Sequence, residues 1–125
     1  MKQKTGIILV GLFIVVAIIF ISTKGEPSLA YIPNASDGTI SVIDIIKQQE
    51  TKTIKAGDGT HGLELSPDGK FLYASNRSSN DLVKLNLENY EITKRVVTGE
   101  TANHVSYVPG DDKLYVTKKI PMIYR

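Results

Sequence analysis

Two histidines and one arginine are the side chains of this sequence with the clearest potential for chemistry. His61 could bind a metal or haem iron, or act as a base, because an imidazole changes charge near neutral pH. Arg77 could hold an anionic group with its planar fork of donors. His104 is the second histidine. Each also has a structural reading, since an imidazole at a strand entrance can satisfy loop amides and Arg77 can lie in solvent.

The sequence contains no complete catalytic or metal-binding set. No nucleophile, base and acid occur together, and there is no phosphate loop and no zinc spacing. Asp37 and Asp58 lie in glycine-containing loops without EF-hand spacing. The absence of cysteine excludes thiolate catalysis, disulfides and cysteine-ligated metals. We therefore predict no catalytic residue, no metal site and no cofactor, and we favour a non-enzymatic role over an enzymatic one.

The elements that must position these side chains recur every 42 residues. Tyr31, Tyr73 and Tyr115 are separated by this spacing, with no gap between the copies. Recurrence at about 40–45 residues is typical of a four-stranded propeller blade or a helical solenoid repeat. The same spacing relates four further pairs: Gly57 and Gly99, Pro67 and Pro109, Ile54 and Val96, and Leu63 and Val105.

Short strands, and not helices, fill the repeat. Apolar or alternating β-branched runs are bounded by turns rich in Asn, Asp, Gly and Pro. Several runs are apolar on both faces, as expected for a small sheet between two neighbours in a β-propeller. We predict an all-β partial propeller of antiparallel blades, one complete and two partial, preceded by a hydrophobic helix. The expected strands are 28–33, 39–45, 51–56, 61–66, 70–75, 81–87, 91–98, 103–108 and 112–117.

The repeat resembles a known family. Residues 31–34 (Y-I-P-N) and 73–76 (Y-A-S-N) are similar to the tetrapeptide of YVTN-type β-propeller repeats, and residues 115–118 match three of its positions. Residues 61–73 resemble the innermost strand, turn and second strand of a blade, and residues 41–44 resemble the third strand. The resemblance covers residues 28–118. It implies an extracytoplasmic propeller of about seven blades, with lactonase-type and haem-binding propellers as more distant relatives.

The same resemblance implies that the loops entering the innermost strands share one rim, the top rim, with the loops leaving the second strands. Ligands of propellers commonly bind at the axial part of this rim. The resemblance would place seven side chains there: Asn34, His61, Asn76, Arg77, Asn103, His104 and Lys118. We take five as candidate ligand-binding residues: His61, Arg77, Asn76, Asn103 and His104. The alternative is structural: asparagines close turns through their own side chains, and His104 aligns with Gly62 and not with His61.

The repeats are fewer than a ring requires, since at least about four blades are needed for closure. After Tyr115 the pattern stops, and residues 119–125 read as an irregular tail containing Pro121. We expect a truncated piece of a longer propeller; the alternative is a short protein that completes its ring from several copies. Open blade faces would be apolar, so self-association is expected.

Residues 1–27 form a separate segment. Lys2 and Lys4 precede an apolar run over residues 6–22. Its 17 residues are at the short end of the roughly 17–25 that span a bilayer and exceed the roughly 7–15 of a signal-peptide core. We predict an uncleaved signal-anchor in the cell membrane, with residues 28–118 extracytoplasmic. The alternative is secretion after cleavage near residues 28–30.

Charge makes nucleic-acid binding improbable. Lys2 and Lys4 account for the formal net charge of +2, and the other basic residues balance the acidic ones. The sequence has no basic patch beyond two Lys/Arg pairs, whereas nucleic-acid binding normally rests on such a patch. The scattered charges are instead typical of a solvated β surface.

Three functions fit these observations. We predict a membrane-anchored or secreted binding or scaffold module whose partner is a protein, a wall polymer or a small ligand. The first alternative is a lactonase-like hydrolase with Glu64 and Asp37 as candidate carboxylates. The second is a haem-binding redox propeller with His61 as an axial ligand.

Overall fold

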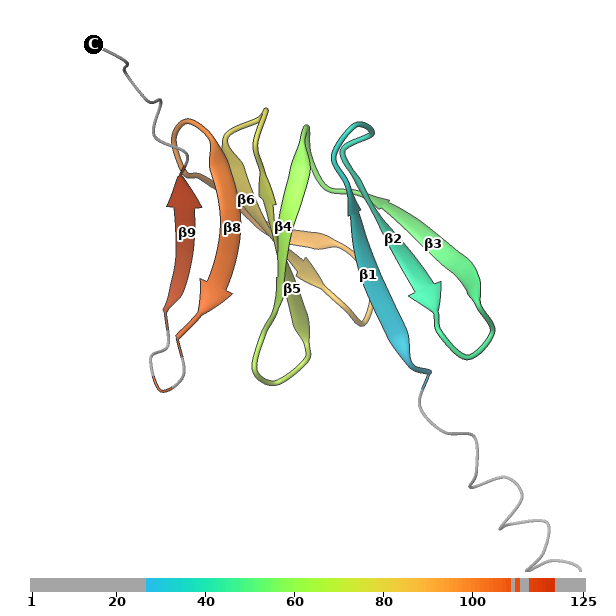
Figure 1. The fold of residues 1–125 in the computed structure, drawn as a ribbon. Helices are drawn as coiled ribbons and strands as arrows, with labels where there is room; N and C mark the ends of the chain where they lie inside the picture. Colours follow the sequence, from blue (N-terminus) through green and yellow to red (C-terminus); the bar gives the residue numbers. More distant parts are fainter. Residues whose placement is uncertain (1–26, 109, 111–112, 119–125) are drawn as a thin grey trace, which may run out of the picture.

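A computed structural model of the chain describes residues 27–108, 110 and 113–118, and within them it shows nine strands in three antiparallel sheets (Figure 1). The all-β prediction is confirmed, and every strand begins and ends within two residues of its expected position. The strands are β1 (Leu29–Asn34), β2 (Thr39–Asp44), β3 (Gln49–Lys55), β4 (Thr60–Leu65), β5 (Phe71–Asn76), β6 (Asp81–Asn86), β7 (Ile92–Val97), β8 (Ala102–Tyr107) and β9 (Leu114–Lys118).

The sheets form one complete blade and two partial ones. Strands β4-β5-β6-β7 make the complete blade, β1-β2-β3 precede it and β8-β9 follow it. Strands β1, β4 and β8 lie side by side where the three sheets meet (Figure 1). The innermost strands of the second and third blades, β4 and β8, are therefore neighbours. Loops that enter these two strands lie together at one end of the sheets.

Two segments predicted from the sequence lie outside the described residues. These are the predicted membrane segment, residues 6–22, and the irregular tail, residues 119–125. In the part of the chain that the structure describes, no helix is long and apolar enough to cross a bilayer.

The 42-residue repeat is visible in the backbone itself. Non-glycine residues with positive φ are uncommon, because the side chain crowds the backbone there. In this structure each such position has an equivalent one repeat away that also has positive φ. The pairs are Gly38 and Asn80, Gln48 and Tyr90, Gly57 and Gly99, and Gly59 and Thr101. The two blades thus share their turn geometry even where the residue type differs.

Gln48 offers a test of this turn geometry. It is exposed and has a φ of 53°, a conformation that costs a residue with a Cβ about 1–2 kcal/mol. Glycine avoids this cost. Part of the gain in the free energy of unfolding is lost, however, because glycine has more conformational freedom in the unfolded chain. We expect Gln48→Gly to raise the free energy of unfolding by about 1 kcal/mol in denaturant titrations. Gln49→Gly, one residue further on inside β3, should lower it instead.

Side-chain hydrogen bonds also recur between blades. The hydroxyl of Thr51 donates to the carbonyl of Val42 at 3.1 Å, and that of Thr93 donates to the carbonyl of Lys84 at 3.2 Å. Both threonines lie where the strand register shifts by one residue, which is the signature of a β-bulge. We call residues that occupy equivalent positions and play equivalent parts in two blades the repeat framework.

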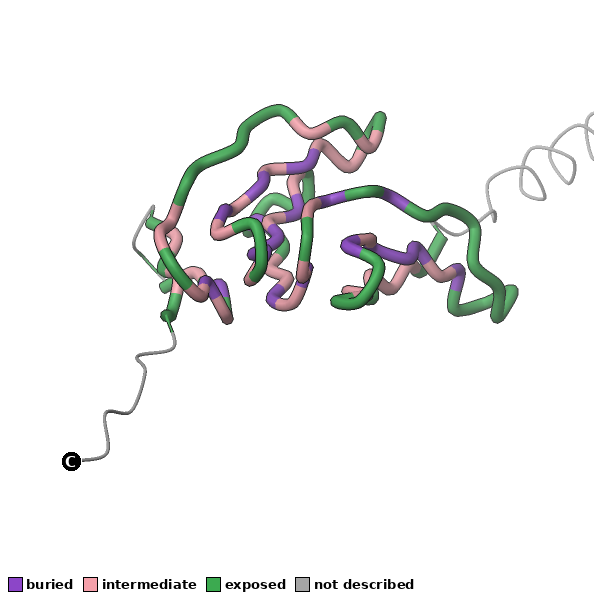
Figure 2. Tube along the Cα trace, turned by 90° about the horizontal axis from the view of Figure 1, so that it is seen from above, coloured by how far each residue is buried: buried purple, intermediate pink, exposed green. Residues whose placement is uncertain are grey.

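An apolar layer joins the first two blades. Ile40, Val42 and Ile54 of the first blade are buried against Leu72, Ala74, Val83 and Leu85 of the second. Figure 2 colours the chain by burial, and the buried residues belong mainly to β2, β5 and β6, whereas β3 and β7 are largely exposed. Most of the stability of the described residues should come from this layer, because burial of apolar area is the main favourable term in folding.

The three repeated tyrosines occupy successive blade faces. Tyr31 packs against the apolar layer, and the ring of Tyr73 meets that of Tyr107 in the third blade edge to face, with centroids 5.6 Å apart. Tyr115, the third of them, is 49% exposed, and the described residues include no further blade beyond it. The prediction that these tyrosines are core parts of a repeat is confirmed for Tyr31 and Tyr73.

One edge of β1 pairs with no described strand. In the complete blade the equivalent strand, β5, lies between β4 and β6, whereas β1 pairs only with β2. The carbonyls of Ser28 and Asn34 accept hydrogen bonds from the β2 side. Because alternate residues of a strand point their backbone groups to opposite edges, those of Leu29, Tyr31 and Pro33 point to the other edge. Pro33 has no N–H to offer there.

Candidate functional site

Four polar residues lie near the points where β4 and β8 begin, and we call them the rim cluster: His61, Arg77, Asn103 and His104. His61 belongs to β4, Asn103 and His104 belong to β8, and Arg77 directly follows β5. The two imidazole rings touch edge to face, with centroids 5.3 Å apart and an interplanar angle of 68°. Of the five predicted ligand-binding residues, the two histidines are thus in contact, Arg77 is near enough for its charge to act on His61, and Asn103 precedes His104 in β8.

A glycine allows β8 to approach β4 this closely. A Cβ built on Gly62 would lie 2.5 Å from the carbonyl oxygen of Asn103 and 3.0 Å from the Cα of His104. Ser75, behind them, links the strands: its hydroxyl accepts from the backbone N–H of Gly62 at 3.0 Å and donates to the carbonyl of Asn103. The contact between the two histidines therefore depends on a residue without a side chain.

Both histidines lie where the strand pairing is irregular, as in a β-bulge. Thr60 pairs with Asn76 and Gly62 pairs with Ser75, so His61 lies between two consecutive pairs and has no residue opposite it. The register of β8 also shifts, between Ala102 and Val105, the stretch that contains Asn103 and His104. An extra residue in a bulge departs from the strict alternation of side chains. This explains why spacing alone, which aligns His104 with Gly62, did not predict the contact.

The side chains whose charges act on His61 in the rim cluster are all basic. Burial lowers the pKa of His61 below its usual range, and the positive charges of Arg77 and His104 lower it further. No carboxylate contributes to this shift. Among the described residues the ion pairs are Lys47 with Asp44 and Arg95 with Asp81, so Arg77 takes part in neither.

Two buried atoms of the cluster lack hydrogen-bond partners. Within the described part of the chain, the Nδ1 of His61 and the Oδ1 of Asn103 are shielded from solvent and make no hydrogen bond. Most buried polar atoms in folded proteins are paired, so an unpaired one calls for an explanation. A bound molecule that offers both donors and acceptors is one such explanation.

Asn76 lies elsewhere, inside the repeat framework. It is fully buried, and its amide accepts from the Thr60 hydroxyl at 2.7 Å and donates to Asp81 Oδ1 at 2.7 Å. Asn34 does the equivalent work one repeat earlier, donating to Thr39 at 3.1 Å. The amide of Asn76 is therefore already engaged, and we leave Asn76 out of the proposed site.

Sequence reasoning missed an ionic link between the first two blades. Arg95 pairs with Asp81 Oδ2, and its other terminal nitrogen donates to the carbonyl of Ala56, next to β3, at 2.9 Å. Asn76 also reaches this carbonyl, at 3.4 Å. The scattered charges in the sequence did not indicate this link, although the Arg95 side chain is still 44% exposed. The signal was a pairing of opposite charges on adjacent strands, which only the register reveals.

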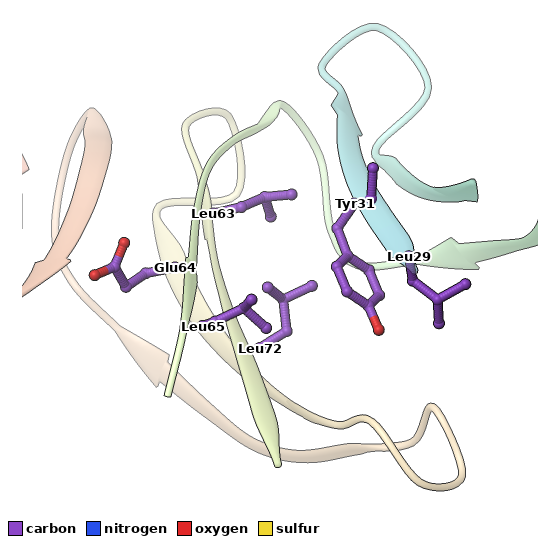
Figure 3. A pocket seen from close by; sticks show the side chains of 7 residues that line it. Leu29, Tyr31, Leu63, Glu64, Leu65 and Leu72 are labelled. Atoms are coloured by element: carbon purple, nitrogen blue, oxygen red, sulfur yellow. The ribbon is translucent and has the colours of Figure 1, made fainter. Parts of the chain in front are cut away.

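A cleft of about 470 Å³ opens between β1 and β4 (Figure 3). Figure 3 shows Leu63 and Leu65 pointing toward β1, while Glu64 points the other way. The Oε1 of Glu64 accepts from the backbone N–H of Tyr107 at 3.2 Å, so this carboxylate joins the second blade to the third. Asp37, the other predicted carboxylate, is exposed in the β1–β2 turn. The described residues contain no group of three or more His, Asp or Glu that could hold a metal ion.

Tyr31 in this cleft predicts a loss of stability at alkaline pH. Burial, and then the neighbouring Tyr90, raise the pKa of Tyr31 from 10.0 to about 12. The folded chain thus holds the phenol proton more tightly than the unfolded chain. This contribution is complete below about pH 10 and is lost as the pH rises toward about 12. Denaturant unfolding across this range should show that the free energy of unfolding of the unmodified chain falls. The fall should be smaller in Tyr31→Phe and unchanged in Tyr115→Phe.

Comparison with known proteins agrees with this architecture. The model of the family described as "Lactonase, 7-bladed beta-propeller" matches residues 28–118. Hydrazine synthase of Kuenenia stuttgartiensis has a similar structure, with a TM-score of 0.69 and 22% identity over 73% of this chain and 26% of that one. Dihydro-heme d1 dehydrogenase NirN, solved in complex with DHE, matches with a TM-score of 0.62 and 18% identity over 74% of this chain and 21% of that one.

These similarities establish the fold and no more, because both identities are below 25%. The chain spans about a quarter of the length of the solved structures that it matches. No protein of curated function matches it.

Proposed function

Because this chain belongs to the family of seven-bladed β-propeller lactonases, we propose that it forms part of a propeller that binds a ligand at its axial rim. The proposal assigns ligand binding to the rim cluster. Its activity is recognition without chemical conversion of the ligand.

One observation carries this proposal: the residues of the rim cluster are polar, lie near one another and have side chains that the repeat does not preserve. Framework positions keep their residue type or their hydrogen bond from one blade to the next, as Asn34 and Asn76 do. At the rim the backbone hydrogen bond of Gly62 to the Ser75 hydroxyl recurs in that of His104 to the Thr117 hydroxyl. The side chains, by contrast, change: His61 is replaced by Asn103 and Gly62 by His104 one repeat later. Side chains that differ between copies and still gather in one place are better explained by a ligand than by the fold.

The test is a ligand screen on the full chain with isotope-labelled histidine. Small molecules that bind at the rim should shift the NMR signals of His61 and His104 in a saturable manner. The same molecules should not bind the His61→Ala/His104→Ala double variant in calorimetric titrations, and the proton NMR spectrum of that variant reports whether it is folded. If every binding molecule leaves both histidine signals unchanged, the rim is not the site.

The proposal also concerns cellular location. We propose that residues 6–22 anchor the chain in the cell membrane and that residues 28–118 are extracytoplasmic, as the YVTN-type resemblance also implies. The length of the apolar run and the two lysines before it support this. The full chain should remain with membranes after alkaline washing, and a variant without residues 1–27 should not. Recovery of a shortened chain in the medium would favour secretion.

Lactone hydrolysis is the second candidate, and the family match favours it. Its weakness is that Glu64, the better-placed carboxylate, accepts a backbone hydrogen bond from Tyr107. Glu64→Gln retains the acceptor and removes the charge, so it should leave stability almost unchanged. Turnover of a lactone in the presence of divalent cations that disappears in Glu64→Gln would replace our proposal with the enzymatic one.

A further inference from the structure

Apart from the carbonyl oxygen of the Asn103 side chain, the rim cluster combines hydrogen-bond donors with positive charge, and no carboxylate of the described residues acts on the His61 ring. Arg77 is permanently charged, and a protonated imidazole donates from both ring nitrogens. Of the charged groups in the described residues, Arg77 and His104 are those that act on the His61 ring. Like charges held close together are unfavourable unless an opposite charge joins them. An anion placed among these side chains would remove that cost.

The cluster is also held in place before any ligand arrives. The backbone N–H of Arg77 donates to the carbonyl of Gly59 at 3.0 Å. The next two residues, Ser78 and Ser79, donate from their backbones to the carbonyl of Asp58, at 3.1 and 3.2 Å. Ser75 fixes the distance between β4 and β8 from behind. Side chains on a backbone of this kind bind with less loss of conformational freedom.

The geometry points to a small oxyanion, a carboxylate or a sulfate- or phosphate-type group, as the ligand of the rim cluster. In this proposal, which rests on the proposed function above, Arg77 supplies the main charge through its fork of donors. His61 and His104 donate to the remaining oxygens. The ligand class is thereby narrowed from any small molecule to an anionic one.

The proposal implies that binding is linked to protons. An anion beside His61 favours its charged form, so binding takes up a proton and tightens as the pH falls. Sulfate is a suitable probe because its own charge is constant over this range. We expect its affinity to rise severalfold between about pH 8 and about pH 6 and to approach a tenfold gain only at lower pH, because a pKa change of about one unit in His61 gives about tenfold once the pH is below both pKa values.

The experiment titrates the full chain with sodium sulfate and, separately, with sodium acetate, and follows the histidine NMR signals. Sodium chloride at matched ionic strength measures general screening. Arg77→Gln should weaken binding about tenfold, as expected for the loss of a charge-assisted hydrogen-bond pair. Lys70→Gln, an equal loss of charge in the exposed β4–β5 turn at the opposite end of β4, should change nothing. Arg77→Lys, which keeps the charge without the fork, should give an intermediate affinity.

The outcomes separate this inference from the proposed function. Saturable shifts with sulfate or acetate that weaken in Arg77→Gln support the inference, and the stronger of the two probes identifies the oxyanion class. If chloride produces the same shifts, or if Lys70→Gln weakens binding as much as Arg77→Gln, the inference is wrong. If a neutral molecule binds at the rim and neither anion does, the inference fails while the proposed function stands.

Discussion

Replacement of Asp81 by alanine is expected to lower the free energy of unfolding by about 3 kcal/mol. Asp81 is only 6% exposed, and it accepts from the buried amide of Asn76 as well as pairing with Arg95. Loss of the acceptor leaves the Asn76 amide buried with one strong bond fewer, which costs about 2 kcal/mol. Because the Arg95 side chain is 44% exposed, solvent screens the ion pair, which adds about 1 kcal/mol or less.

Denaturant unfolding of the full chain checks this value. Asp37→Ala is the matched control, since Asp37 is an exposed aspartate in the equivalent β-turn of the first blade. Asp81→Asn should fall between the two, because an amide oxygen can still accept from Asn76. An Asp81→Ala variant that is no less stable than Asp37→Ala would show that the link between the first two blades does not stabilise the fold.

Gly62→Ala is expected to destabilise the chain by about 2–3 kcal/mol and to separate the two histidines. The new Cβ would lie 2.5 Å from the carbonyl oxygen of Asn103 and 3.0 Å from the Cα of His104. Both are backbone atoms of β8, so no side-chain rotation can relieve the overlap, and β8 must shift. Loss of the edge-to-face contact should appear as a change in the His61 and His104 NMR signals, together with weaker binding at the rim.

Gly69→Ala provides the comparison. Nothing lies within 4 Å of a Cβ built on Gly69, but its φ of 69° makes alanine unfavourable by about 1 kcal/mol. The Gly69 variant should therefore lose some stability and keep the histidine signals unchanged. If Gly62→Ala leaves those signals in place, the close approach of β8 to β4 is not what brings the rim cluster together.

Most of the fold could be predicted from the sequence because a repeat multiplies each signal. One copy of Asp-Gly or Pro-Asp-Gly between apolar runs is weak evidence for a turn. The same pattern at a fixed spacing, joined to the recurring Tyr31, Tyr73 and Tyr115, is strong evidence. Turn positions recur even where glycine does not, as at Gln48 and Tyr90. The predicted strands were therefore accurate to within two residues.

The candidate site was harder to predict because its side chains differ between the copies, although the irregular pairing beneath them recurs in β4 and β8. His61 lies in a β-bulge, which the alternation of apolar and polar residues cannot reveal. Gly62 matters because it has no Cβ, which leaves room for β8 to approach β4. Asn76 occupies a repeated position, 42 residues after Asn34, but only the hydrogen bonds show that its amide is already engaged. Contacts between strands that are far apart in the chain require the register, which one sequence does not contain.

No described strand covers the second edge of β1, and Pro33 affects what could add to it. An uncovered strand is a template on which another chain can add, and repeated addition produces fibres. Of the three residues of β1 whose backbone groups point to that side, Pro33 offers an acceptor and no donor. A strand that added to this edge would therefore form one backbone hydrogen bond fewer at Pro33. The equivalent residue of β5, Ser75, has the N–H that Pro33 lacks. Proline at such an edge is one of the ways in which proteins disfavour the unlimited addition of strands.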